Sequence, residues 1–289
     1  MKFLNESGLM VGWCVGKVPP HALSATLLIK GTFDLRPGAP AQLAPKQELL
    51  SGDAHEEEDP AKPLRYASDF AWFKPRADAT LVGTCHQPGG RANVVCPVSL
   101  RIGSWSKRLA VVGDRILKPR LLFFTSISDP MPFQRMKLSY DRSFGGPAYP
   151  KNPLGRGFGE IRLPNIMSYD RLFIDPDSRP EPAGFGPLPE MAPQRVTKIG
   201  TLNKTWKKKH WPGLPQDADW SLFNAAPIDQ QLPEFFRGDE KVLFENLHPS
   251  HPIFESQLPG LRARWFVTDP KGFREVPMKL DTLWFDMDA

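Results

Sequence analysis

Proline is the residue that most restricts what this chain can fold into. The 289 residues include 32 prolines, about twice the usual share of 5 %. Of these, 21 lie from Pro119 to Pro270, and the longest proline-free interval among them, 194–211, holds 18 residues. Because a proline inside a helix removes a backbone hydrogen bond and clashes with the preceding turn, long helices are excluded from the second half of the chain.

The first 130 residues carry the alternation that is typical of β-strands. In "HALSATLLIKGTFDL" (21–35), every second residue from Leu23 to Ile29 is apolar, and β-favouring residues follow Gly31. The stretch 98–112 predicts a hairpin, because two alternating runs flank a Gly-Ser turn. Further strands are expected within 76–86 and 263–289. This spacing predicts a mostly β fold, either an antiparallel β-sandwich or barrel-like sheets, with long Pro/Gly-rich loops.

A few short helices complete this expectation. One is expected within 217–226 and another within 232–247, where the second half equally favours a strand. Helix content should stay under about a fifth, against a typical share near a third. We find no internal repeat and no clean linker, so a single domain over residues 1–289 is expected.

The compartment is inferred from what the chain lacks. No run approaches the roughly 18 apolar residues that span a bilayer, and three cysteines make an odd, sparse count that is unlike a disulfide scaffold. Glu6 falls where the apolar core of a signal peptide would begin. We therefore expect a cytoplasmic protein with no membrane contact.

The residues that could bind a metal have the wrong spacing for it. Cys85 and Cys96 are eleven positions apart, whereas zinc ligands usually come in close pairs. His248 and His251 each precede a proline, which biases both toward extended backbone. We expect no metal and no cofactor.

Catalytic and nucleotide-binding motifs are also weak. "GRGFGE" (155–160) lacks the strand before it and the helix after it that a dinucleotide loop needs, because Pro153 and Pro164 flank it. There is no Gly-x-Ser-x-Gly motif, and Cys85 and His86 would point to opposite faces of a strand. A protein without enzymatic activity is expected; the alternative is a hydrolase with its site in the Pro/Gly-rich middle of the chain.

The net charge of +5 is concentrated in one segment. Between Met191 and Gln216 there are six Lys or Arg residues and no Asp or Glu, which leaves the rest of the chain at −1. "NKTWKKKHWPG" (203–213) interleaves base and aromatic, so it could bind an acidic protein, bind single-stranded nucleic acid, or be a solvated loop. We favour an acidic protein over nucleic acid, with these candidate contacts: Lys204, Trp206, Lys207, Lys208, Lys209 and Trp211.

A second candidate binding region is "SYDRSFGGPAYPKNPLGRGF" (139–158). Its four glycines permit tight turns and its three prolines restrict the backbone between them. Such a preorganised loop loses little entropy on binding, and aromatic and Arg residues dominate interface hot spots. The alternative is a corner that pins the loop to a sheet. The candidate contacts are Tyr140, Arg142, Phe144, Asn152, Arg156 and Phe158.

Several stretches, in chain order, resemble one family of bacterial domains of unknown function. Members occur beside the spike proteins of type VI secretion systems and are regarded as effector-loading adaptors or chaperones. The stretches are "LIKGTFDL" (28–35), "SDFAWFKPRADATLVGTCHQPGG" (68–90), "MKLSYDRSFGGPAYPKNPLGRGF" (136–158), "LPN" (163–165), "FNAAPIDQQLPEFFRGDEKVLFENLHPSHP" (223–252), "LPG" (258–260) and "DTLWFDMDA" (281–289).

The resemblance implies a protein that holds a toxic effector and helps to dock it on the spike. That spike is the valine-glycine-repeat (VgrG) trimer, often with a PAAR tip. Cys85 stands where the family usually has a small residue, which favours a packing role for this thiol. Members of the family also continue past the final Asp-rich turn into another strand, so the chain is either truncated at Ala289 or lacks that strand.

Overall fold

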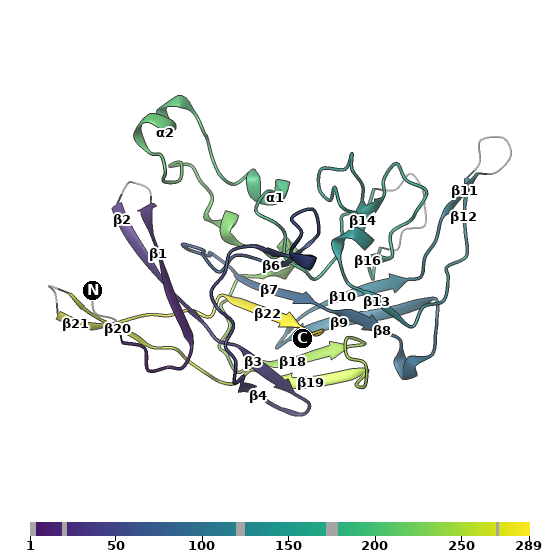
Figure 1. The fold of residues 1–289 in the computed structure, drawn as a ribbon, viewed down its shortest axis with the longest axis horizontal. Coiled ribbons are helices and arrows are strands. Elements are labelled where there is room, and N and C mark those ends of the chain that lie inside the picture. Colours follow the sequence, from purple (N-terminus) through teal and green to yellow (C-terminus); the bar gives the residue numbers. More distant parts are fainter. Residues whose placement is uncertain (1–3, 19–21, 120–124, 172–178, 270–271) are drawn as a thin grey trace.

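The centre of the computed structural model is a sheet of seven strands (Figure 1). Neighbouring strands are antiparallel except for one parallel pair, β19 and β4. The order is β16 (Ile166–Ser168), β10 (Trp105–Val112), β9 (Val95–Ile102), β18 (Lys241–Glu245), β19 (Ile253–Gln257), β4 (Ala39–Leu43), β3 (Phe33–Arg36). The residues that the structure describes are 4–18, 22–119, 125–171, 179–269 and 272–289.

The predicted hairpin at 98–112 is confirmed as β9 and β10. Ile102 pairs with Trp105 across the turn, where Gly103 has a φ of 56° that favours glycine. Val98, Leu100 and Ile102 are buried, while the residues between them point away from the core.

A second sheet of three strands shares the same hydrophobic core. It consists of β17 (Gln231–Leu232), β7 (Ala77–Val82) and β22 (Thr282–Asp286), with β7 and β22 parallel. Leu81 belongs to the core that Leu100 of β9 also lines. Phe285 of β22 meets Phe244 of β18 edge to face, with ring centroids 5.1 Å apart. The two sheets are therefore joined by direct aromatic packing.

All six residues of β7 are buried, so this strand has covered surfaces on both faces. On the face away from the large sheet, the Asp78 carboxylate accepts hydrogen bonds from the Asn224 amide at 2.8 Å and the Ala225 backbone N–H at 2.9 Å. The Lys74 ammonium lies 3.1 Å from the same carboxylate and donates to the Thr282 hydroxyl at 2.7 Å. One buried charge pair thus connects β7, β22 and two loops.

The remaining strands form pairs, and three of these pairs extend from the body at its two ends (Figure 1). The extended pairs are β1 (Met10–Val18) with β2 (Ala22–Lys30), β11 (Leu117–Pro119) with β12 (Thr125–Ile127), and β20 (Trp265–Asp269) with β21 (Gly272–Val276). The others are β5 (Ala54–His55) with β6 (Leu64–Tyr66), β8 (Thr84–His86) with β13 (Arg135–Lys137), and the parallel pair β14 (Phe144–Gly145) with β15 (Arg156–Gly157).

Helices contribute 10 % and strands 39 % of the described residues, which confirms the mostly β prediction. Within the described part, no helix has the length and apolarity that crossing a membrane requires. The α-helices are α1 (Pro193–Val196) and α2 (Lys204–Lys209); the 3₁₀ turns are η1 (Glu56–Glu58), η2 (Pro88–Gly90), η4 (Tyr140–Arg142), η5 (Trp220–Phe223) and η6 (Ile228–Gln230).

The positions of the helices differ in part from expectation. The helix expected within 217–226 is a single 3₁₀ turn, η5, capped by Asp219. Within 232–247, residues 233–240 contain no helix and are followed by β18. The strand alternative for the second half of this segment is therefore correct, and the helix expected in the segment is wrong. The reason is tertiary, because β18 pairs on both sides, with β9 and β19, and buries Phe244 completely.

We predict that Asp78→Ala lowers the free energy of unfolding by about 3–5 kcal/mol, because it leaves the buried Lys74 ammonium without a counter-charge. Urea denaturation measures this. The matched control is Glu57→Ala, which removes an exposed carboxylate from Lys62 and should change stability little. Equal midpoints for the two variants would contradict a structural role for the buried pair.

Candidate partner-binding surface

The loop 139–158 is organised around the side chain of Asn152. Its amide donates hydrogen bonds to the backbone carbonyls of Tyr140 at 2.8 Å and Phe144 at 3.0 Å. A Cβ atom on Gly155 would lie 2.4 Å from that amide nitrogen, so a side chain at this position has no room. Asn152 therefore ties the second half of the loop to its first residues from inside.

Aromatic side chains close the loop over a small apolar cluster. Phe144 is only 2 % exposed and meets Tyr149 and Phe158 edge to face, with centroid distances of 5.1 and 6.4 Å. Beneath the three rings lie buried residues of the neighbouring strands and loop: Val112, Leu163 and Met167.

Arg156 is half-buried and holds the loop to its neighbours. Its Nε donates to the Asp141 carbonyl at 2.9 Å, and its Nη1 donates to Oδ1 of Asn165 at 3.2 Å. Burial, and then the nearby charge of Arg142, lower the pKa of the Arg156 guanidinium. This arginine is engaged in the fold rather than extended toward solvent.

Tyr140 also points inward. A Cβ atom on Gly184 would lie 2.9 Å from the Tyr140 ring, so the glycine allows the ring to pack against the backbone there. Burial raises the pKa of this phenol well above its usual range. The loop is thus a pinned corner, as the alternative interpretation of the sequence described. A partner could touch only its outer residues, among which Lys151 and Leu154 are exposed.

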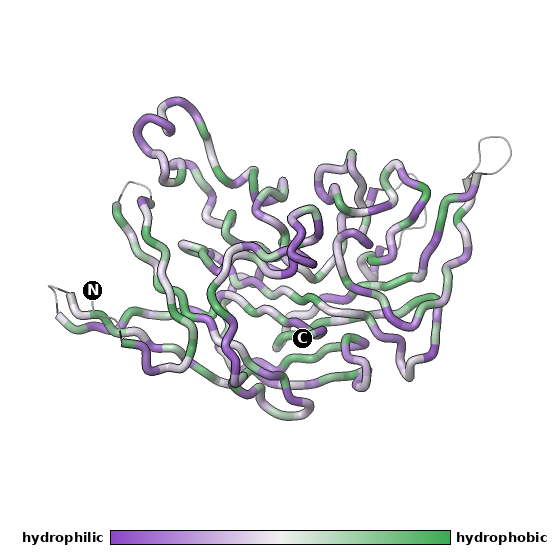
Figure 2. Tube along the Cα trace, viewed as in Figure 1, coloured by the Kyte–Doolittle hydropathy of each residue, from purple (hydrophilic) through white to green (hydrophobic). Residues whose placement is uncertain are grey.

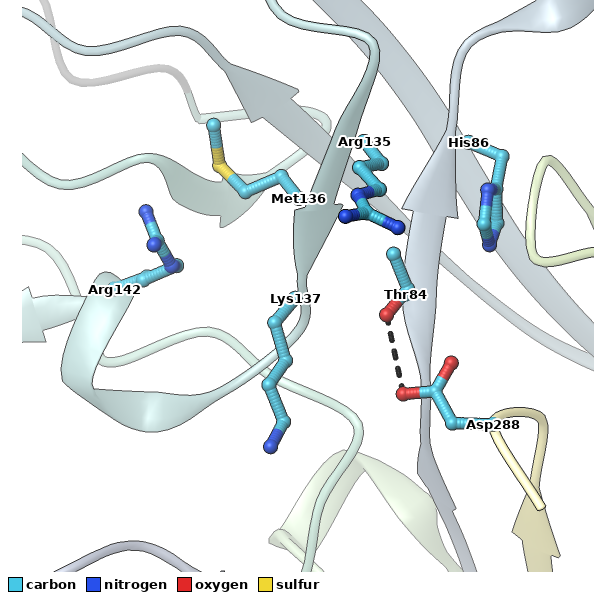
Figure 3. A pocket seen from close by; sticks show the side chains of 7 residues that line it. All are labelled: Thr84, His86, Arg135, Met136, Lys137, Arg142 and Asp288. Carbon is cyan, nitrogen blue, oxygen red and sulfur yellow. Dashed lines mark hydrogen bonds between the residues drawn. The ribbon is translucent and has the colours of Figure 1, made fainter. Parts of the chain in front are cut away.

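Beside this corner is an open, polar recess of about 340 Å³ (Figure 3). Its walls come from β8 and its partner β13, from η4, and from the residues after β22. The lining residues are Thr84, His86, Arg135, Met136, Lys137, Arg142 and Asp288.

The recess carries positive charge, because Arg135, Lys137 and Arg142 all line it. The Thr84 hydroxyl donates to the Asp288 carboxylate at 3.1 Å. Burial, opposed by Asp288 and assisted by Arg135, lowers the pKa of His86. The Lys137 ammonium pairs with Glu56 outside the recess.

The basic segment differs from the loop because its side chains are exposed. Its residues form α2, which begins where the Asn203 side chain accepts a hydrogen bond from the Trp206 backbone N–H at 2.8 Å. The Trp206 indole donates to the Gly213 carbonyl at 2.8 Å, so this ring holds the following turn. The four lysines of α2 are exposed and form no ion pair within the described ranges: Lys204, Lys207, Lys208 and Lys209.

Trp211 completes the basic segment and is 67 % exposed. The segment and the loop 139–158 lie apart, α2 at the upper left and β14 right of the centre in Figure 1, so the structure does not bring the two sets of candidate residues together. It brings the basic segment against the β1–β2 hairpin instead. A Cβ atom on Gly213 would lie 2.8 Å from the carbonyl oxygen of Lys17 in β1.

The candidate metal ligands form two pairs, Cys85 with Cys96 and His248 with His251. Cys85 and Cys96 are buried in the main core, where the hydrogen bond with Cys96 and burial raise the pKa of Cys85. The rings of His248 and His251 are 4.8 Å apart near the surface. Over the described residues, no three His, Cys, Asp or Glu side chains gather as a metal site would require.

Comparison with known families matches residues 21–289 to DUF2169, described as an uncharacterized protein conserved in bacteria. The chain belongs to this family. The matched range begins at the start of β2 and includes both candidate regions, whereas β1 precedes it. Comparisons with curated proteins and with solved structures give no match.

We predict that Asn152→Ala loosens the corner and lowers stability by about 1–3 kcal/mol, because the carbonyls of Tyr140 and Phe144 lose their donor. Hydrogen exchange should become faster across 139–158 and stay unchanged in β9. Lys151→Ala, at the exposed neighbouring position, is the control. Unaltered exchange in the loop of the Asn152→Ala variant would show that the aromatic cluster alone holds it.

Proposed function

We propose that this protein is a non-enzymatic adaptor of type VI secretion, which binds a toxic effector and assists its loading onto the VgrG/PAAR spike. Two observations support the proposal. The stretches that resemble effector-loading adaptors follow one another in the same order and span nearly the whole chain. The chain also belongs to a bacterial family over residues 21–289. Loading precedes export, so the proposed location is the cytoplasm.

The observation that carries the proposal is the exposed, uncompensated charge of α2. Folding does not use these lysines, since they form no ion pair among the described residues and stand away from the core. Uncompensated charge at a protruding site accelerates encounter with a partner of opposite sign. Trp211 adds an exposed aromatic group of the kind that anchors protein interfaces.

An adaptor must hold two proteins at once, and the molecule offers separate regions for this. The basic segment and the corner 139–158 lie apart, on either side of the centre of the molecule (Figure 1). We assign one partner to each region. Partners bound this far apart would not compete for the same surface.

We predict that reversing the four α2 lysines (Lys204, Lys207, Lys208 and Lys209) to Glu weakens binding of the partner at the basic segment severalfold and reduces its salt dependence, because encounter loses its electrostatic attraction. Biolayer interferometry measures this, with a purified toxic effector and a purified VgrG/PAAR spike protein from the same bacterium. Thermal stability should hardly change.

The control reverses four exposed lysines elsewhere, so that the net charge changes equally: Lys46, Lys118, Lys241 and Lys279. Equal binding by both variants would show that α2 is ordinary solvated surface and does not contact the partner. Retardation of single-stranded DNA by the unmodified protein, lost steeply as salt rises, would favour the nucleic-acid alternative.

A further inference from the structure

The β1–β2 hairpin is packed with its small residues inward and its large residues outward. Gly12 and Gly16 of β1 face the body, where a Cβ atom would lie 2.5 Å from the Leu50 side chain and 2.2 Å from the Trp72 ring. Cys14, between the two glycines, is buried. The small residues thus let Leu50 and Trp72 lie directly against the hairpin.

The opposite face of the hairpin is apolar and solvent-exposed. Val15 is 56 % and Leu23 is 76 % exposed, although large aliphatic side chains are usually buried. Figure 2 shows the apolar character of both strands. Because partners in antiparallel strands share a face, the register places these residues together: Val11, Trp13, Val15, Leu23, Leu27 and Ile29.

This apolar face adjoins the turn that follows α2. Lys17 follows Val15 on the same side of β1 and pairs with Leu23 of β2. Lys17 lies against Gly213 in that turn, where a Cβ atom on the glycine would lie 2.8 Å from the Lys17 carbonyl oxygen. Lys17 thus links the outer face of the hairpin to the segment of α2, and we call the outer face, Lys17 and α2 together the hairpin–α2 surface.

We propose that the hairpin–α2 surface is a docking site for an acidic polypeptide segment that carries apolar side chains. The apolar side chains of the segment cover Val15 and Leu23, and its carboxylates meet Lys17 and the lysines of α2. The proposal rests on the proposed function, since the segment belongs to the effector or to the spike.

Charge and backbone hydrogen bonding both favour a polypeptide of this composition. Within the described residues, β1 and β2 form a sheet of two strands, so each has an outer edge with no neighbouring strand. A partner strand satisfies such an edge, whereas lipid tails offer no hydrogen bonds and would leave its peptide groups unpaired at considerable cost. A second copy of the chain would bring the same lysines to the interface, whereas an acidic segment neutralises them.

The test uses fluorescein-labelled short peptides and the full chain, with binding measured by fluorescence anisotropy. One peptide alternates Glu with Val and Leu; the second replaces Glu with Lys; the third replaces Val and Leu with Ser. We expect the first to bind at least about tenfold more tightly than either of the others, because only it offers both apolar burial and opposite charge.

Variants locate the site. Val15→Ser with Leu23→Ser should weaken binding of the first peptide by about tenfold or more. The Lys-to-Glu variant of α2 should abolish the preference for the first peptide over the second, since these two differ only in the sign of their charge. The matched control is Leu43→Ser with Ile253→Ser, which removes exposed apolar side chains from β4 and β19 and should leave binding unchanged. If the hairpin variant melts early, Leu23→Lys alone replaces it.

Three results would overturn the proposal: no preference for the acidic apolar peptide, equal losses in the hairpin and control variants, or a concentration-dependent dimer that Val15→Ser with Leu23→Ser abolishes. Binding to phosphatidylserine vesicles with no binding of the first peptide would also overturn it, in favour of a membrane surface.

The proposed function has a separate readout. If the effector and the spike bind the hairpin variant as tightly as the unmodified chain, the docking site is wrong and the adaptor role stands. If neither protein binds the unmodified chain, the adaptor role itself fails, whatever the peptides show.

Discussion

The buried pair of Lys74 and Asp78 is the interaction on which the arrangement of the molecule most depends. Removing two charges from water is costly, and the cost is offset here because the carboxylate also accepts hydrogen bonds from Asn224 and Ala225. The pair holds the loop before β7 in one position. Two residues earlier in that loop, Trp72 lies against the inner face of the β1–β2 hairpin. A charge pair in the interior thus fixes the base on which an exposed appendage stands.

The hairpin shows how small residues can determine which face of a strand is exposed. Leu50 occupies the space that a side chain at Gly12 would fill, and the ring of Trp72 occupies that at Gly16. This ring also stacks near Phe223, and the Trp72 backbone carbonyl accepts a hydrogen bond from the Thr26 hydroxyl. With its inner face filled in this way, the hairpin directs its larger apolar residues to solvent. Exposed apolar surface of this kind favours association, so its presence on an extended arm fits a protein that acts by binding.

The loop 139–158 uses similar residue types for the opposite purpose. Its glycines bring backbone against Asn152, and its aromatic rings fill the space under the loop. These contacts make the loop rigid before any partner binds. They also bury most of the side chains that could have formed a binding hot spot. The adjoining recess keeps a positive lining, from Arg135 and Arg142, next to the rigid corner.

Much of the fold could be predicted from the sequence because its signals are local. Proline restricts its own backbone wherever it stands, and alternation reports a half-buried strand, so the mostly β architecture and the hairpin of β9 and β10 follow without knowledge of the rest. The concentration of lysine from 204 to 209 is likewise a property of the chain itself. The alternation of Gly12, Cys14 and Gly16 with larger residues also indicates a strand with one face of small residues. The reason for that face becomes clear only when Trp72 is found packed against it.

The sequence by itself determined the strands, the exclusion of long helices and the basic segment. Tertiary structure decided which of these features face solvent. Asn152 and Phe144 point inward because they meet partners within a folded loop, and Val15 points outward because Trp72 occupies the other face. Lys17 lies against Gly213, in the turn after α2, through a contact between residues far apart in the chain. Such contacts depend on how the elements pack together, and no local pattern of residues encodes that packing.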